Sequence, residues 1–250
     1  MKRTVSGVIK ALEGKKINVT LRRMHTISRE VQELRFNMQG GGTDGRYGYF
    51  IMVTRGPSET ALSYIHKIDL ETWETVKISK PLPMYHANDL TYDPKNHRLV
   101  VSHCDVKPDE ISLVDPETLE RQEVKTIAQK HYSIAYNPNK GLYVTGKSRT
   151  YDFVLLDEQF RPVTLLAGED GHIKQGLECD DDFIYFFQTG VRYNWIFVFD
   201  WDGTFLRKIP VPMVGESENL FVRGDHFIGA FNNNESNTAD IYEMILEEGE

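Results

Sequence analysis

The sequence predicts an all-β fold built from a repeated unit of short strands, and three observations support this prediction. One sequence motif, the repeated phrase, occurs four times. It consists of a strand that ends in an apolar residue and Asp, then a short polar turn, then a second strand. Its aspartates, Asp69, Asp115, Asp157 and Asp200, are 46, 42 and 43 residues apart. A degenerate copy of the motif, IYEMILEEGE, has Ile245 at the position of the Asp, 45 residues after Asp200. Repeats of this length are typical of a β-propeller, because one small sheet cannot bury both its faces without neighbours.

Two further strand-like runs precede the repeated phrase in each unit. The first runs start near residues 39, 86, 131, 175 and 216, and read QGGGTD, HANDLTYD, HYSIAYN, QGLECD and ESENLFV. The second, more apolar runs are YFIMVT, RLVVS, GLYVT, FIYFF and HFIGAF, each preceded by turn formers. β-branched and aromatic residues bounded by Gly, Asp, Asn or Pro indicate strands. The count of first strands therefore predicts a five-bladed β-propeller of four-stranded antiparallel blades.

The fifth unit lacks an outer strand, and an N-terminal strand is expected to complete this last blade. Such closure removes an exposed sheet edge. The region from 15 to 35 contains two suitable segments, INVTL (17–21) and REVQELRF (29–36), and the pattern does not choose between them. Residues 1–14 are expected to form a short helix or a frayed tail. A closed ring without a Pro/Ser/Gly-rich linker predicts a single domain over 1–250.

Composition argues against several classes of partner. The chain has 29 Lys and Arg against 37 Asp and Glu, a net charge of −8, whereas nucleic-acid binding calls for a basic surface. The sequence contains neither a secretory apolar core nor a run of about 20 apolar residues that could span a membrane. Cys104 and Cys179 read as free thiols, which fits a reducing compartment. We expect a cytoplasmic protein without nucleic-acid or membrane partners, and the oligomeric state stays open.

Propeller topology indicates where a site should lie. The first strand of each blade runs outward from one face and the second runs back to it, so the starts of first strands and the ends of second strands gather on one face. Polar side chains clustered at the opening of an apolar scaffold favour a ligand site. The expected catalytic residues are His86, His103 and Glu218. The expected ligand-binding residues are Gln39, Arg55, Asn88, Asp89, Tyr132, Lys147, Gln175 and Glu216. Other polar residues on this face are Asp105, His131, Arg149, Gln188, Asn232 and Asn233.

His86 and His103 belong to adjacent strands of one blade and are expected to lie close together. Histidine titrates near neutrality, so this pair with Glu218 could transfer protons. The sequence predicts binding of a small polar ligand, a sugar fragment or a peptide, with or without lyase, hydrolase or cyclotransferase chemistry. The alternatives are a non-catalytic peptide or glycan recognition module, a protein-interaction scaffold, and a hydrated face without chemistry. Whether the protein is an enzyme stays open.

No cofactor or metal is predicted from local motifs. The stretch from Gly141 to Ser148 matches the phosphate-loop pattern formally, but its middle, LYVT, is itself a strand and no helix follows. No Cys and His spacing suits structural zinc.

Several segments resemble a group of bacterial single-domain propellers known mainly as uncharacterised proteins. These segments are QGGGTDGRYGYF, YHANDLTYDPKNHRLVVSH, YSIAYNPNKGLYV and KQGLECDDDFIYF, and they span about residues 36–234. The chain is more distantly similar to the five-bladed glutaminyl cyclotransferases of plants and bacteria, whose first blade opens with a Gln-Gly strand like Gln39-Gly40. Those enzymes also carry an Asn-Glu strand start late in the chain, loosely like Glu218-Asn219. The resemblance implies the propeller fold and cyclotransferase-type chemistry; the second blade departs from it, and no catalytic residue is carried over.

Overall fold

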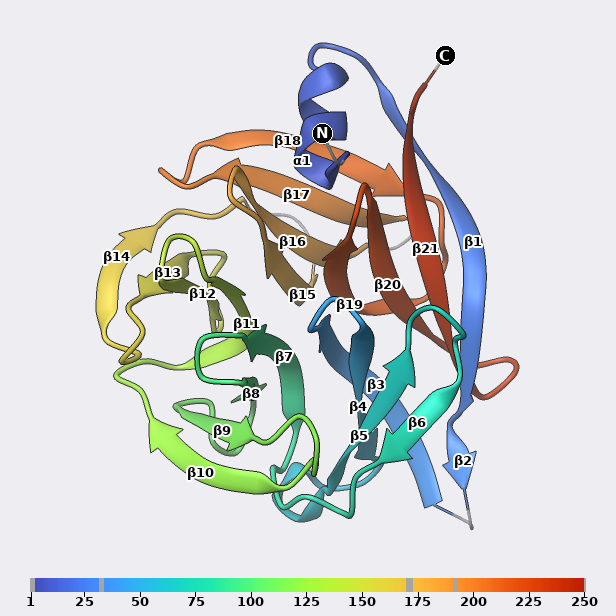
Figure 1. Cartoon of the computed structure of the whole chain (residues 1–250), viewed down its shortest axis with the longest axis vertical. Helices are drawn as coiled ribbons and strands as arrows, with labels where there is room; N and C mark the ends of the chain where they lie inside the picture. The colour runs from blue at the N-terminus through green and yellow to red at the C-terminus, as the bar shows by residue number, and fades with distance from the viewer. Residues whose placement is uncertain (1–2, 32–33, 170–172, 191–192, 250) are drawn as a thin grey trace.

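Five antiparallel sheets surround a central axis in the computed structural model, which describes residues 3–31, 34–169, 173–190 and 193–249 (Figure 1). The innermost strands of the five sheets, β3, β7, β11, β15 and β19, contact one another around this axis. The predicted five-bladed propeller is therefore confirmed.

Within a blade the strands follow one another from the axis to the rim. Blade 1 contains β3 (Leu34–Thr43), β4 (Tyr47–Thr54), β5 (Ser63–Asp69) and β6 (Thr75–Ile78), with the short β2 (Glu30–Val31) beside β3. Blade 2 contains β7 (Ala87–Asp93), β8 (Arg98–His103), β9 (Glu110–Val114) and β10 (Arg121–Thr126). Blade 3 contains β11 (His131–Asn137), β12 (Leu142–Lys147), β13 (Phe153–Leu156) and β14 (Pro162–Leu166). Blade 4 contains β15 (Ile173–Cys179), β16 (Phe183–Thr189), β17 (Asn194–Asp200) and β18 (Phe205–Val211). Blade 5 contains β19 (Glu216–Arg223), β20 (His226–Asn233), β21 (Thr238–Glu248) and β1 (Ile17–Ser28).

The N-terminal strand β1 closes the ring, as predicted. It pairs antiparallel with β21, from Ile17 opposite Glu248 to Ser28 opposite Thr238, and the two strands lie side by side in Figure 1. The closing segment is therefore the one that contains INVTL. The alternative, REVQELRF, instead supplies β2 and the first residues of β3, so β3 begins five residues before the predicted start at Gln39.

Of the two alternatives for residues 1–14, the structure contains a helix, α1 (Val5–Ala11). Thr4 caps it, because its Oγ1 accepts a hydrogen bond from the Gly7 amide at 3.1 Å. The apolar face, with Val8 and Ile9, packs on the hydrophobic core that blades 4 and 5 share. The helix therefore covers the core next to the seam that β1 closes.

The repeated aspartates have a local structural reason. In each copy the Asp side chain accepts hydrogen bonds from two backbone amides of the turn that follows, as Asp69 does from Glu71 (2.8 Å) and Thr72 (3.2 Å). Asp115, Asp157 and Asp200 repeat this arrangement. Ile245 lies inside β21 opposite Thr20, because here the outer strand comes from the N-terminal region and no such turn exists.

The inner strands approach one another so closely that the axis needs glycine and buried acceptors. A Cβ on Gly40 would lie 2.1 Å from the Asp89 Cα. Asp89 is fully buried, and its Oδ2 accepts hydrogen bonds from the amides of Ile134 and Leu177, both at 3.2 Å. One carboxylate therefore joins the inner strands of blades 2, 3 and 4.

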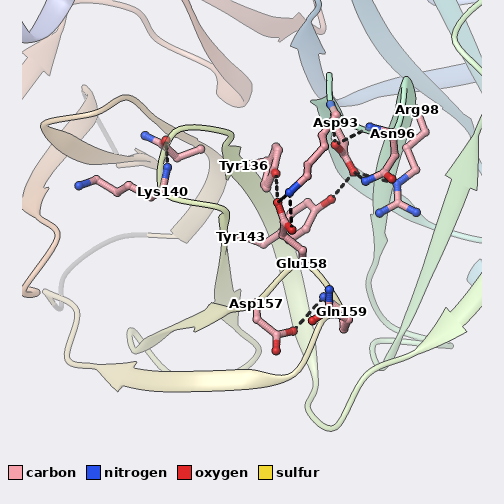
Figure 2. A network of polar contacts seen from close by, with 11 residues as sticks. Asp93, Asn96, Arg98, Tyr136, Lys140, Tyr143, Asp157, Glu158 and Gln159 are labelled. Atoms are coloured by element: carbon pink, nitrogen blue, oxygen red, sulfur yellow. Dashed lines mark hydrogen bonds and ion pairs between the residues drawn. The ribbon is translucent and has the colours of Figure 1, made fainter.

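The face that carries the β7–β8 and β13–β14 turns is held together by paired charges (Figure 2). Figure 2 shows Asp93 pointing toward Arg98 and Tyr143, whose side chains donate to it at 2.9 and 2.8 Å. Lys95 Nζ lies 2.8 Å from both carboxylate oxygens of Glu158, which also accepts from Tyr136 at 3.0 Å. These contacts join blades 2 and 3, so we infer that this network stabilises the fold.

Candidate functional site

A cavity of about 210 Å³ opens between blades 1 and 2, where β4 and β8 end and β7 begins. We call it the mouth cavity. Three of the predicted site residues, Gln39, Arg55 and His86, line it together with Asp105, which the topology also places on this face. The other lining residues are Asn37, Val53, Thr54, Gly56, Ser58 and Ala61.

His86 is held between the two blades by both of its ring nitrogens. Nδ1 lies 3.1 Å from Asp105 Oδ2, and Nε2 lies 2.8 Å from Gln39 Oε1. Ser58 also donates its hydroxyl to Asp105 at 3.3 Å. The imidazole is therefore fixed in position at the edge of the cavity while remaining partly exposed.

His103 does not join His86, although their backbones are adjacent. The Cys104 amide donates to the His86 carbonyl at 3.0 Å, so the two strand ends meet as expected. The His103 side chain is fully buried, and its Nε2 contacts Ser112 Oγ at 3.0 Å. Burial, with a smaller contribution from Arg121, lowers the pKa of His103 to about 4. In the part of the chain that the structure describes, no hydrogen bond joins the two imidazoles, and His103 does not line the mouth cavity.

Glu218 belongs to a second polar group, at the seam between blades 5 and 1. It is only 2% exposed and accepts a hydrogen bond from Asn232 Nδ2. The Asn232 amide also bonds to the backbone of Met38, accepting at 3.0 Å and donating at 3.1 Å. Burial and then the neighbouring charge of Glu216 raise the pKa of Glu218 well above its ordinary value. Glu216 in turn accepts from Gln175 Nε2 at 2.8 Å, so these predicted residues are brought together.

Arg29 connects this group to the mouth cavity, and the sequence analysis missed it. The residue is 1% exposed, and its guanidinium donates to Asn37 Oδ1, which also accepts from Arg55 Nε at 2.8 Å. Burial and Arg55 lower the pKa of Arg29, whereas Glu218 and Glu216 raise it. A buried carboxyl group such as that of Glu218 needs a nearby cation, and this need was the feature that could have indicated Arg29. The segment around Arg29 has the alternating pattern of a closing strand, and that pattern does not reveal a buried arginine.

The other predicted ligand-binding residues join blades and do not line the mouth cavity. Asn88 Nδ2 donates to the Tyr132 carbonyl at 2.8 Å, and the Tyr132 ring is buried under Lys174 Nζ at 4.3 Å. Lys147 accepts a hydrogen bond from the same Nζ through its carbonyl. The carboxylate of Asp89 is occupied at the axis by backbone amides. Position on a strand end was therefore not enough to expose Asn88, Asp89 and Tyr132, which are buried, whereas Lys147 is partly exposed.

A β-bulge lies near the mouth end of every inner strand. These bulges help explain why some predicted residues line the mouth cavity and others are buried between blades. The irregularities fall between Met38 and Gly41, Ala87 and Asp89, His131 and Ser133, Lys174 and Leu177, and Ser217 and Asn219. A bulge adds a residue to one strand and redirects the side chains next to it. Side chains at these positions therefore do not follow the simple alternation of a strand.

Acid is expected to destabilise the protein through His131, which is fully buried and has no hydrogen-bond partner for either ring nitrogen among the described residues. Burial lowers the pKa of His131 to about 4, and nearby His103 lowers it too; the backbone groups of Gln129 and Pro108 and the charge of Asp109 oppose this, although no ring nitrogen reaches hydrogen-bond geometry with them. Below the unfolded pKa of about 6.5 the unfolded chain binds more protons, so stability falls as pH drops from 6.5 towards 4. The contribution is about 3 kcal/mol at most.

Urea denaturation at pH 7, 5.5 and 4.5 measures this effect. The His131→Phe variant should lose stability less steeply on acidification than the wild type. His97→Gln, on the face of the turns, should keep the wild-type slope. Equal slopes for all three proteins would exclude His131 as a titrating group in this range.

The comparisons with known proteins agree with this architecture. No protein-family model and no curated protein match the chain. The crystal structure of Myxococcus xanthus glutaminyl cyclase is similar with a TM-score of 0.65 and 13% identity, over 94% of this chain and 100% of that chain. A Bacteroides caccae protein of unknown function is similar with a TM-score of 0.50 and 14% identity, over 70% of this chain and 67% of that chain.

None of the helices in the described part of the chain has the length and apolarity that crossing a membrane requires. At such identities the likeness to solved structures concerns the fold alone. The chain thus has a five-bladed propeller fold that is similar to the fold of a bacterial glutaminyl cyclase.

Proposed function

We propose that the mouth cavity binds a small polar ligand, such as a sugar fragment or the end of a peptide. The supporting observation is the polar lining that two blades contribute to one cavity of about 210 Å³. Ligand pockets for drug-sized molecules hold about 300–1,000 Å³, so this cavity suits a single residue or sugar unit. Arg55, oriented through Nε by Asn37, supplies a planar guanidinium suited to a carboxylate or carbonyl oxygen.

A second candidate is chemistry on the bound ligand, and the contact between His86 and Asp105 favours it. Imidazole–carboxylate pairs of this kind occur in hydrolytic and acyl-transfer enzymes. The fold likeness to a glutaminyl cyclase makes peptides with an N-terminal glutamine the first substrate class to assay.

Thermal-shift screening of the wild type against sugars, dipeptides and N-glutaminyl peptides tests the binding proposal. A ligand present at 100 times its dissociation constant stabilises the folded state by about 2.7 kcal/mol. Arg55→Ala and His86→Ala should each remove most of the shift produced by a hit. The matched control is Arg161→Ala, an exposed arginine paired with Asp157 on the face of the turns. A shift that survives both cavity variants unchanged would place the ligand elsewhere.

A further inference from the structure

We propose that the wall of the mouth cavity holds a divalent transition metal, best matched by zinc, through His86, Cys104 and Asp105. The imidazole nitrogen, the thiol sulfur and a carboxylate oxygen of these residues lie within 4.8 Å of one another. The inference deepens the proposed function, because the metal's remaining position would face the ligand. Metal binding itself does not require that a ligand be present.

The distances are close to those of an occupied site. Tetrahedral zinc ligands at 2.0–2.3 Å from the ion lie roughly 3.3–3.8 Å from one another. The His86 Nδ1 and Asp105 Oδ2 atoms are already 3.1 Å apart, and no pair in the group exceeds 4.8 Å. Side-chain movements of about 1 Å therefore suffice to bring the three atoms onto one ion.

The three donors lie next to the paired ends of two strands. His86 directly precedes β7, whereas Cys104 and Asp105 directly follow β8. The Cys104 amide donates to the His86 carbonyl at 3.0 Å, which extends the β7–β8 ladder to the donors themselves. Strand pairing therefore fixes the backbones of His86 and Cys104, and Asp105 follows one residue later, in the turn after β8.

The second nitrogen of His86 has the partner that metal-bound histidines have. Nε2 lies 2.8 Å from Gln39 Oε1, and donating a proton there leaves Nδ1 with a lone pair. Nδ1 then faces the Asp105 carboxylate at 3.1 Å, lone pair against lone pair. With the Gln39 amide in this orientation, the space between Nδ1 and the Asp105 carboxylate must hold either a second imidazole proton or a cation.

Cys104 adds a soft donor that would otherwise be an inert thiol. Its Sγ lies 3.5 Å from Asn88 Oδ1, and the Asn88 amide is oriented by its bond to the Tyr132 carbonyl. Burial, Asp105 and Glu218 raise the pKa of this thiol. A divalent ion reverses that balance: the S–H bond breaks, the sulfur–metal bond forms, and the proton is released to solvent. Mixed nitrogen, sulfur and oxygen donors favour zinc over magnesium or calcium.

Calorimetric titration of chelator-treated protein with Zn²⁺, and absorption spectroscopy with Co²⁺, test the proposal. We expect one zinc per chain, proton release on binding, and a thiolate-to-cobalt charge-transfer band. Cys104→Ser should abolish the band and weaken zinc binding by about 100-fold or more, and Asp105→Asn should weaken binding similarly. Cys179→Ser removes the other free thiol, in blade 4, and should change neither readout.

Two variants separate this proposal from the proposed function. Arg55→Ala should lose the ligand-induced thermal shift but bind zinc with wild-type affinity. Cys104→Ser should show the weakened zinc binding and keep the shift of any ligand that binds metal-free protein, because Cys104 does not line the cavity. The metal site is wrong if the wild type gives no thiolate-to-cobalt band, or if Cys104→Ser and wild type bind zinc equally well.

Discussion

Arg29→Ala is expected to lower the free energy of unfolding by about 3–5 kcal/mol, the range for removing one partner from a buried charge group. Arg29 Nε donates to the Phe36 carbonyl at 3.0 Å, and Nη1 donates to the Asn233 carbonyl at 3.3 Å and to Asn234 Oδ1 at 2.9 Å. With its bond to Asn37, this one side chain ties blade 5 to the inner strand of blade 1. Its loss removes the donor to the buried Phe36 carbonyl and to the partly exposed acceptors of Asn233 and Asn234, and leaves the interior of the seam without its cation.

Urea denaturation at neutral pH measures the change. Arg29→Lys should recover only part of the stability, because an ammonium group cannot reproduce the planar fork of a guanidinium. Arg55→Ala is the matched control: Arg55 shares Asn37 but is exposed, and its loss should cost less than about 1 kcal/mol. A loss for Arg29→Ala as small as that for Arg55→Ala would show that Arg29 does not secure the seam.

Gly40→Ala is expected to destabilise the propeller by about 3 kcal/mol or more, or to prevent folding. The added methyl would lie 2.1 Å from the Asp89 Cα and 2.6 Å from the Asn88 carbonyl oxygen. These are backbone atoms, so no side-chain rotation relieves the clash. Blades 1 and 2 would have to separate at the axis, which would also disturb the contact of Gln39 with His86.

Thermal melting and soluble yield measure this outcome against a glycine that lies in open space. Gly224, in the turn between β19 and β20, has a φ of 66° and no atom within 4 Å of an added Cβ. Asparagine tolerates that conformation, so Gly224→Asn should change stability by less than about 1 kcal/mol. Wild-type melting of Gly40→Ala would mean that the axis is looser than the structure shows.

Much of the fold could be predicted because it repeats a local device. The Asp turn between the third and fourth strands recurs every 42–46 residues, and it marks four of the five blades without any knowledge of tertiary contacts. The closing segment could not be chosen in advance, since INVTL and REVQELRF both alternate. Their assignment depends on pairing with β21, more than 200 residues away in the chain.

The candidate site was predicted less completely, and the inner-strand bulges are one reason. Topology alone brings Gln39, Arg55 and His86 to one cavity. The bulge between Ala87 and Asp89 breaks the alternation that would have shown which neighbours of His86 face the cavity. The proposed metal donors could not be predicted for a related reason: strand pairing, not spacing along the chain, brings Cys104 next to His86.

The closure of the ring by β1 also constrains how the protein is made. Thr20 and its partner Glu247 are separated by 227 residues, so a ribosome completes four blades before the rim of the fifth can be sealed. During that interval Ile17 and Val19 have no partner strand, and β-structure built on such distant contacts forms slowly. Until β21 has been synthesised, the backbone hydrogen-bonding groups of β1 that later pair with it therefore remain open to pairing with other chains.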